Sequence, residues 1–226
     1  MTAGGSRQDM FYHLLYPLHT KISFFNIFQY ITFRTIYASL TAFLLCFFLG
    51  PIFIRWLSRM QVGQYIRAVG PATHQEKAGT PTMGGVLIIC AVLGASLLWA
   101  DLTNWYVWIV LVAIAGFTAI GFVDDYLMQV KKRNMGLSTR AKFFLQVVLA
   151  AMICLAIYTV YDFDTSLVVP FFKNINPNLG VFYVLFGAFV IVGASNAVNL
   201  TDGLDGLATG PLVIAFVAYM LFAYVA

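Results

Sequence analysis

Long apolar runs dominate the chain and are separated by short polar segments. A helix needs about 20 predominantly apolar residues to cross a bilayer, and six runs approach that length. The predicted spans are 35–57, 84–100, 105–123, 141–161, 180–198 and 207–226. The strict alternation of polar and apolar residues that a membrane β-barrel requires is absent from the sequence. The pattern therefore predicts an all-α fold, a polytopic transmembrane helical bundle.

The residues before the first span are less uniformly apolar. Residues 1–9 are small and polar, and we interpret them as a disordered tail or a remnant of cloning. Residues 10–34 are rich in aromatics but include His19 and Lys21, which favours a segment lying at the membrane surface. A partial first span is the alternative. Residues 35–226 form the predicted transmembrane domain, and the run at its end stays apolar. We therefore expect the chain to be the N-terminal part of a longer protein.

Composition supports a membrane protein over a soluble one. Hydrophobic residues make up 61% of the chain and charged residues 10%, against roughly 45–50% and 25% in soluble domains. The net charge of +4 is modest, and the basic residues lie between apolar runs rather than on one solvated face. This distribution argues against a nucleic-acid partner. No spacing of cysteine and histidine indicates zinc.

The distribution of basic residues predicts the orientation of the chain. Lys and Arg are concentrated in the loops after the first and third spans and are scarce after the second and fourth. Because cytoplasmic loops carry an excess of Lys and Arg, the first and third loops should face the cytoplasm. The N-terminus is then outside, and Trp99, Trp105 and Trp108 bracket the outer interface.

The acidic residues are the most informative for chemistry. Those on the predicted cytoplasmic side are Glu76, Asp124, Asp125, Asp202 and Asp205. Asp124 and Asp125 close the third span, where a helix C-terminus disfavours each carboxylate by about 0.3–1 kcal/mol. Such a pair is suited to a cation, and because neighbouring side chains point about 100° apart, one carboxylate can bind a metal while the other orients a partner. The alternative is that both mark the membrane surface and pair with Lys131 or Lys132.

A second polar motif, NAVNLTDGLDGL, ends the fifth span. Asn199, Asp202 and Asp205 recur every three residues, which places them within about 120° of one helical face. The two glycines of the motif favour a loop instead, with its backbone close to a ligand. In either case oxygen donors gather at the end of a span, and such ligands suit Mg²⁺. The alternative is a polar turn before the sixth span.

The first cytoplasmic loop, HQEKAGTPTMGG, is the third polar element. Lys77 provides a positive charge, Thr80 and Thr82 provide hydroxyls, and the glycines expose backbone N–H groups, so the stretch can line an anion site. A plain connecting loop is the alternative. The three polar elements offer acidic residues for a metal and a basic residue for phosphates, at the surface of a membrane that can hold a lipid. This combination favours phosphoryl transfer between a lipid phosphate and a soluble phosphorylated donor.

Three motifs together resemble the phospho-N-acetylmuramoyl-pentapeptide transferase (MraY) family of polyprenyl-phosphate N-acetylhexosamine-1-phosphate transferases. They are GTPTMGG at 79–85, GFVDDY at 121–126 and NAVNLTDGLDGLA at 196–208. The resemblance implies a multi-pass enzyme of the bacterial inner membrane, with about ten spans, a cytoplasmic active site and Mg²⁺ as cofactor. The implied reaction transfers phospho-MurNAc-pentapeptide from UDP-MurNAc-pentapeptide to undecaprenyl phosphate. It yields lipid I and UMP in the first membrane step of peptidoglycan synthesis.

The resemblance also implies roles for individual residues. The catalytic pair is implied to be Asp124 and Asp125. Substrate contacts are implied for Lys77, Thr82, Lys142, Asn199 and Asp202. The metal is implied to bind Asp124, Asp125 and Asp202. A homodimer is a further partner that the family often forms.

The family has a further catalytic aspartate and a histidine-rich loop after the sixth span, and these 226 residues contain neither. We therefore expect the 226 residues alone to be inactive. Two routes stay open, direct attack by the lipid phosphate and a covalent aspartyl-phosphate intermediate. Two other functions also stay open. One is a sister transferase that acts on UDP-GlcNAc, and the other is a cation-coupled transporter, in which intramembrane acids mark ion paths.

Overall fold

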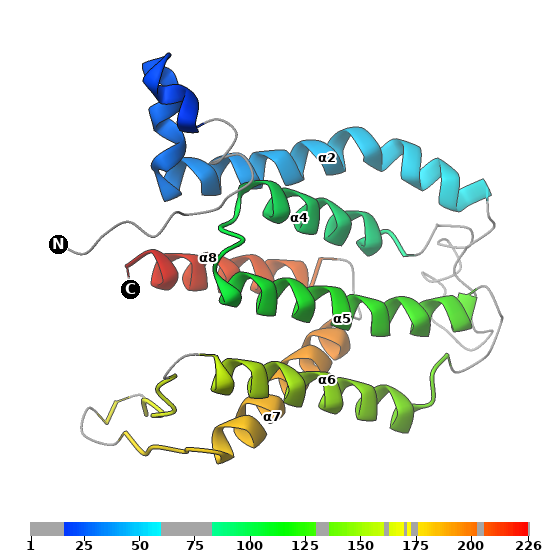
Figure 1. The fold of residues 1–226 in the computed structure, drawn as a ribbon. Coiled ribbons are helices and arrows are strands. Elements are labelled where there is room, and N and C mark those ends of the chain that lie inside the picture. The colour runs from blue at the N-terminus through cyan, green and yellow to red at the C-terminus, as the bar shows by residue number, and fades with distance from the viewer. Residues whose placement is uncertain are drawn as a thin grey trace. The chain divides into compact units, whose positions relative to one another are not determined.

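The computed structural model describes residues 16–59, 83–129, 136–160, 163–169, 171–172, 176–202 and 206–225. In these ranges the regular elements are helices (Figure 1), and one isolated antiparallel bridge joins Ser166 to Asn178. In chain order the helices are η1 (Tyr16–Thr20), η2 (Ser23–Gln29), α2 (Ile31–Arg59), α4 (Gly85–Trp99), α5 (Trp105–Gln129), α6 (Thr139–Thr159), α7 (Phe182–Thr201) and α8 (Thr209–Val225). The predicted all-α fold is therefore confirmed for the described part of the chain.

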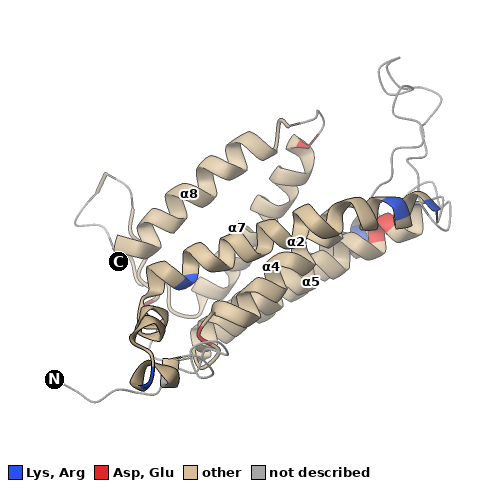
Figure 2. Cartoon of the chain, turned by 90° about the horizontal axis from the view of Figure 1, so that it is seen from above, with Lys and Arg blue, Asp and Glu red and all other residues tan. Residues whose placement is uncertain are grey.

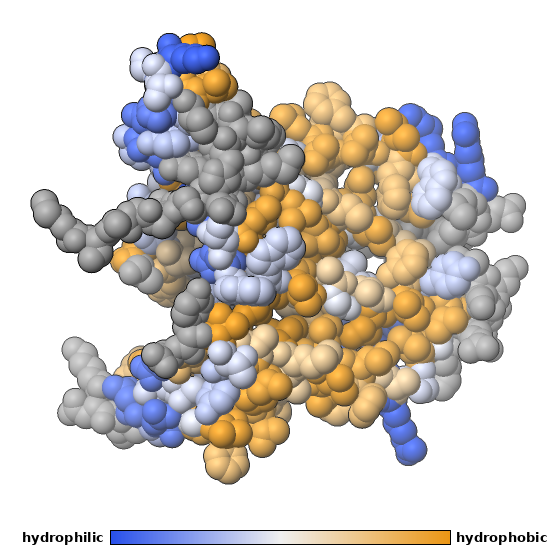
Figure 3. Space-filling model, in the orientation of Figure 1, coloured by the Kyte–Doolittle hydropathy of each residue, from blue (hydrophilic) through white to orange (hydrophobic). Residues whose placement is uncertain are grey.

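Each of the six predicted spans contains an apolar helix. Among the described residues, α2, α5, α6 and α7 are long and apolar enough to cross a membrane. Helices α4 and α8 have 15 and 17 residues, or about 22 and 26 Å at 1.5 Å per residue, somewhat less than the roughly 30 Å hydrocarbon core. Apolar side chains cover much of the visible surface (Figure 3), as expected of helices that face lipid.

Charge is confined to the ends of the described helices (Figure 2). In α2, for example, the basic residues are Arg34 near the start and Arg55 and Arg59 near the end. A charged side chain at the centre of a bilayer costs about 2.5–3.5 kcal/mol or more, so this distribution suits membrane-spanning helices. The protein is therefore a multi-pass helical membrane protein.

The largest differences from the predicted boundaries are at the start of α2 and at the end of α5. Helix α2 begins at Ile31 rather than at residue 35, and the residues before it form the short helices η1 and η2. Helix α5 continues to Gln129 rather than stopping at residue 123. The helix therefore continues past the aspartate pair, and Asp124 and Asp125 lie within its last turns.

The chain forms two compact units, Met1–Leu149 and Ala150–Ala226, with the boundary inside α6. In the first unit α4 packs against both α2 and α5 (Figure 1). Ala91 and Ala95 of α4 are buried, and their small side chains let a neighbouring helix approach closely. The Trp99 ring, at the end of α4, stacks on Phe28 with centroids 6.1 Å apart, and its Nε1 donates to Thr41 Oγ1 at 3.1 Å. These contacts join η2, α2 and α4.

The second unit contains the end of α6, the loop that follows it, α7 and α8. Helices α6 and α7 touch at Gly187, where a Cβ would lie 2.6 Å from the Cys154 sulfur. In the loop, the buried Thr165 hydroxyl donates to Asn178 Oδ1 at 2.6 Å. The connection between these two helices therefore has an ordered hydrogen-bonded base.

Candidate active site at the aspartate pair

The predicted site residues divide between the two units. Asp124, Asp125 and Lys142 belong to the first unit, and Asn199 and Asp202 belong to the second. The structure brings the first three together, whereas a common site for both groups stays a prediction. Lys77 and Thr82 lie outside the described residues.

The aspartate pair is split by the geometry of α5. Because consecutive helical side chains point about 100° apart, the two carboxylates face different surroundings. Asp124 is buried, with 9% of the residue exposed, whereas Asp125 is exposed. The two carboxylates therefore have different surroundings, and their division between a metal and a partner stays a prediction.

Both carboxylate oxygens of Asp124 are held by the chain that follows α5. The Lys142 ammonium is 2.7 Å from Oδ2, and the Leu137 backbone N–H donates to Oδ1 at 2.9 Å. The Lys142 and Asp124 side chains are only 24% and 13% exposed. Hydrogen bonds to an ionised carboxylate are roughly twice as strong as neutral ones, and this pair is better shielded than a surface ion pair worth about 0–1 kcal/mol.

The start of α6 places these donors. Ser138 precedes the helix, and its hydroxyl accepts a hydrogen bond from the Ala141 N–H at 3.3 Å, as an N-cap serine does. The cap sets where α6 begins, and Lys142 follows one turn later. Gly136 lies just before Leu137 in the left-handed region, at φ +57°, and a Cβ there would clash with Asp124 Oδ1. The left-handed backbone costs other L-residues about 1–2 kcal/mol.

Lys142 therefore has a partner that the sequence did not indicate. The resemblance implies that it contacts a substrate phosphate, and the structure pairs it with Asp124. Gly136 and Leu137 are absent from the predicted site residues. Their signal in the sequence is a glycine followed two positions later by the cap serine of α6, which marks a tight entry into a helix.

Asp125 is the carboxylate of the pair that is open to a ligand. Among the described residues its side chain has no hydrogen bond or ion pair, and it lies beside Asp124 in sequence. Both oxygens of Asp124 already accept N–H groups, and one of these comes from an ammonium that repels a cation, so Asp125 is the better placed of the two carboxylates to bind a cation. The described residues contain no cluster of three metal-ligating side chains. Mg²⁺ usually takes one or two carboxylates together with water and phosphate oxygens, so Asp125 fits a magnesium ligand.

The second group lies at the C-terminal end of α7. Asn199 is in the last turn and Asp202 follows the helix directly, and both are exposed. The Asp202 N–H donates to the Val198 carbonyl at 3.2 Å, so the backbone is still helical up to this point. The helical interpretation of the motif is confirmed as far as Thr201. Asp205 lies outside the described residues.

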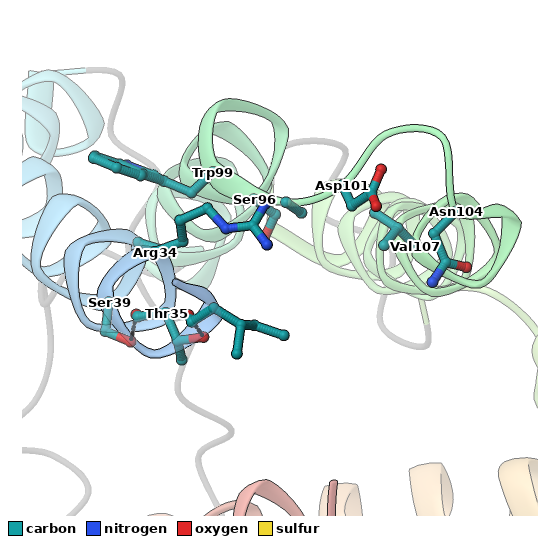
Figure 4. A pocket seen from close by; sticks show the side chains of 11 residues that line it. Arg34, Thr35, Ser39, Ser96, Trp99, Asp101, Asn104 and Val107 are labelled. Carbon is teal, nitrogen blue, oxygen red and sulfur yellow. Dashed lines mark hydrogen bonds between the residues drawn. The ribbon is translucent and has the colours of Figure 1, made fainter. Parts of the chain in front are cut away.

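One cavity lies away from the predicted site residues. It has a volume of about 450 Å³ and lies between α2, the end of α4 and the start of α5 (Figure 4). Arg34 lines it and is 6% exposed, together with Trp99 and Asp101. Val107 of the lining is 17 residues before Asp124 on the same helix, or about 26 Å at 1.5 Å per residue. The cavity is therefore separate from the aspartate pair.

The apolar helices, with polar and charged residues at their ends, define a multi-pass membrane protein. Comparison with known families makes the assignment specific. The model described as glycosyl transferase family 4 matches residues 107–226, and phospho-N-acetylmuramoyl-pentapeptide-transferase signature 1 matches residues 77–89. The chain belongs to glycosyl transferase family 4.

Curated relatives extend this similarity over almost the whole chain. It is similar to the phospho-N-acetylmuramoyl-pentapeptide-transferases of Desulfosudis oleivorans, at 73% identity over 217 residues, and of Desulforapulum autotrophicum, at 63%. The enzyme of the same name from Syntrophus aciditrophicus is 52% identical. Each alignment covers 96% of this chain and 60% of the relative. The chain therefore spans about 60% of the length of these relatives.

Proposed function

We propose that the protein transfers phospho-MurNAc-pentapeptide from UDP-MurNAc-pentapeptide to undecaprenyl phosphate, with lipid I and UMP as products. The observation that carries this proposal is the 73% identity with a phospho-N-acetylmuramoyl-pentapeptide-transferase over 96% of the chain. Signature 1 contains Lys77 and Thr82, and the family model contains the predicted site residues from Asp124 to Asp202. Each implied role thus falls within a matched region.

The geometry at α5 supports phosphoryl transfer. Such reactions depend mainly on positioning and on neutralising charge. Asp124 holds the Lys142 ammonium at 2.7 Å, and because an ammonium has three N–H donors, Lys142 can bind a phosphate oxygen without leaving Asp124. Asp125 is exposed beside this pair and is the residue that would hold Mg²⁺ or orient the lipid phosphate. When bound, Mg²⁺ would supply charge neutralisation at the transferred phosphoryl group.

The proposed site lies on the cytoplasmic face of the bacterial inner membrane, with the N-terminus outside. Helices α5 and α7 are separated along the chain by one candidate span, α6. If each crosses the bilayer once, α5 and α7 run in the same direction. Their C-terminal ends, which carry Asp125 and Asp202, then reach the same membrane surface. The basic loops of the sequence favour the cytoplasmic side for that surface. We also propose that the protein forms a homodimer.

The other two functions gain no support from the described residues. The relatives compared above carry the muramyl name rather than a UDP-GlcNAc one. A cation-coupled transporter would place acids deep in its spans, whereas Asp124 and Asp125 lie in the last turns of α5.

The test is transfer by the complete protein that contains these residues, purified and placed in liposomes with undecaprenyl phosphate. We expect UMP and lipid I to form from UDP-MurNAc-pentapeptide, to stop on addition of EDTA and to resume with Mg²⁺. UDP-GlcNAc in place of the muramyl donor should release no UMP. Release from UDP-GlcNAc alone would assign the sister reaction, and release from neither donor would end the proposal.

A further inference from the structure

We propose that Gly136 is a positioning residue for this transfer, because its lack of a side chain lets the chain after α5 hold the Asp124 carboxylate. This role rests on the proposed function and adds to it a residue outside the three motifs of the resemblance. Gly136 itself touches no substrate. It acts through Asp124, and through Asp124 on the Lys142 ammonium.

The space beside Gly136 is already filled by Asp124. A Cβ on Gly136 would overlap Asp124 Oδ1 and would lie 3.0 Å from the Asp124 backbone oxygen. The backbone oxygen belongs to α5 and cannot move without moving the helix. The carboxylate is the part that can yield, so a side chain at position 136 would turn the Asp124 side chain away from its present position.

Turning that side chain would break both of its contacts. Oδ1 would lose the Leu137 N–H, now at 2.9 Å, and Oδ2 would lose the Lys142 ammonium, now at 2.7 Å. Lys142 would then be free to take other positions near Asp125. The position of the Lys142 ammonium relative to Asp125 would change, although every residue proposed to contact the substrate would still be present.

A second glycine separates this effect from simple backbone strain. Gly180 also has a positive φ, +49°, but a Cβ there would meet nothing within 4 Å. Gly180→Ala therefore introduces left-handed strain without a clash and lies outside the predicted site. It is a matched control for Gly136→Ala.

The experiment uses the complete protein in liposomes. Gly136→Ala should lower kcat about tenfold or more and leave the KM for UDP-MurNAc-pentapeptide within about twofold, since transition-state interactions are lost and ground-state binding is kept. Gly180→Ala should keep kcat within about twofold of wild type. A wild-type kcat in Gly136→Ala would overturn the proposal, and so would a loss confined to KM.

Thermal unfolding gives a readout that does not need activity. In the wild-type background, Gly136→Ala should lower Tm more than Gly180→Ala does. In an Asp124→Ala background the clashing carboxylate oxygen is gone and only the backbone oxygen at 3.0 Å remains, so Gly136→Ala should lower Tm less than it does in the wild-type background. This is the non-additivity expected of residues in contact. Equal effects of Gly136→Ala in both backgrounds would overturn the proposal. The Tm comparison can be made even if the wild-type protein shows no transfer. The absence of transfer would reject the proposed function but not the contact between Gly136 and Asp124.

Discussion

The ends of α5 and α7 each carry acidic or amide side chains after a long apolar helix, but they are built differently. At the end of α5, the start of α6 contacts the buried Asp124 through Leu137 and Lys142. At the end of α7, Asn199 and Asp202 are exposed, and the backbone N–H of Asp202 donates to the Val198 carbonyl. The described residues organise the end of α5, whereas the side chains at the end of α7 are exposed. Asp125 resembles Asn199 and Asp202 in being exposed, although it is next to the buried Asp124.

The largest effect is expected from Asp125→Asn. Because Asp125 is exposed, its loss should leave Tm unchanged while kcat falls by about a hundredfold or more, as for the loss of a group that acts in the transition state. Transfer assays and thermal unfolding of the same preparations measure both quantities. Asp124→Asn should instead lower kcat and Tm together, and a stability loss in Asp125→Asn would remove the distinction between the two carboxylates.

Lys142→Met should be the most destabilising change at the α5 end. It leaves the mostly buried Asp124 carboxylate without its cation, which we expect to cost about 1–3 kcal/mol, less than for a fully buried pair. For a protein of this size that lowers Tm by about 2–4 °C per kcal/mol. Arg140→Met, in the exposed first turn of the same helix, is the control and should leave Tm unchanged.

In the double variant Asp124→Asn/Lys142→Met no charge is left without a partner, so its Tm should lie above that of Lys142→Met. A double variant less stable than both single variants would contradict the ion-pair account of this helix end.

Asn199→Ala and Asp202→Ala test whether the end of α7 binds the nucleotide. Each should weaken binding of a uridine nucleotide about tenfold, or 1.4 kcal/mol, without lowering Tm, because both side chains are exposed. Calorimetric titration of the complete protein with UDP measures the affinity. A fall in Tm with unchanged affinity would contradict this prediction. It would show that Asn199 and Asp202 stabilise the fold, as Asp124 does, rather than bind the nucleotide.

The smallest effect is expected at Asp164, in the loop after α6. Hydrogen bonds from Ser166 lower the pKa of the Asp164 carboxyl below its usual value. A lowered folded-state pKa adds stability above the unfolded-state pKa of about 3.9, and that stability is lost as pH falls through the folded-state pKa. Asp164→Asn should therefore lower Tm slightly at pH 7, by an amount that shrinks on acidification, and leave transfer unchanged. A loss of transfer would show that acids outside both helix ends also matter.

Apolar length was enough to predict α2, α5, α6 and α7, because a span is a property of one continuous segment. The extension of α5 past residue 123 was not predicted, since Asp124 and Asp125 resemble a helix end and only contacts with α6 show why the helix continues. The Asp124–Lys142 pair joins residues 18 positions apart across two helices, which no local pattern encodes. The role of Gly136 likewise depends on a neighbour in space.

We infer that the fold divides the aspartate pair, so that Asp124 binds Lys142 and Asp125 is left to bind a cation. The most direct measurement is an experimental structure of the complete protein with Mn²⁺ in place of Mg²⁺ and a uridine nucleotide, with the metal located by anomalous scattering. We predict the metal within bonding distance of an Asp125 carboxylate oxygen, with Lys142 still on Asp124. A metal bound to Asp124, with Lys142 displaced from it, would contradict this division between the two carboxylates.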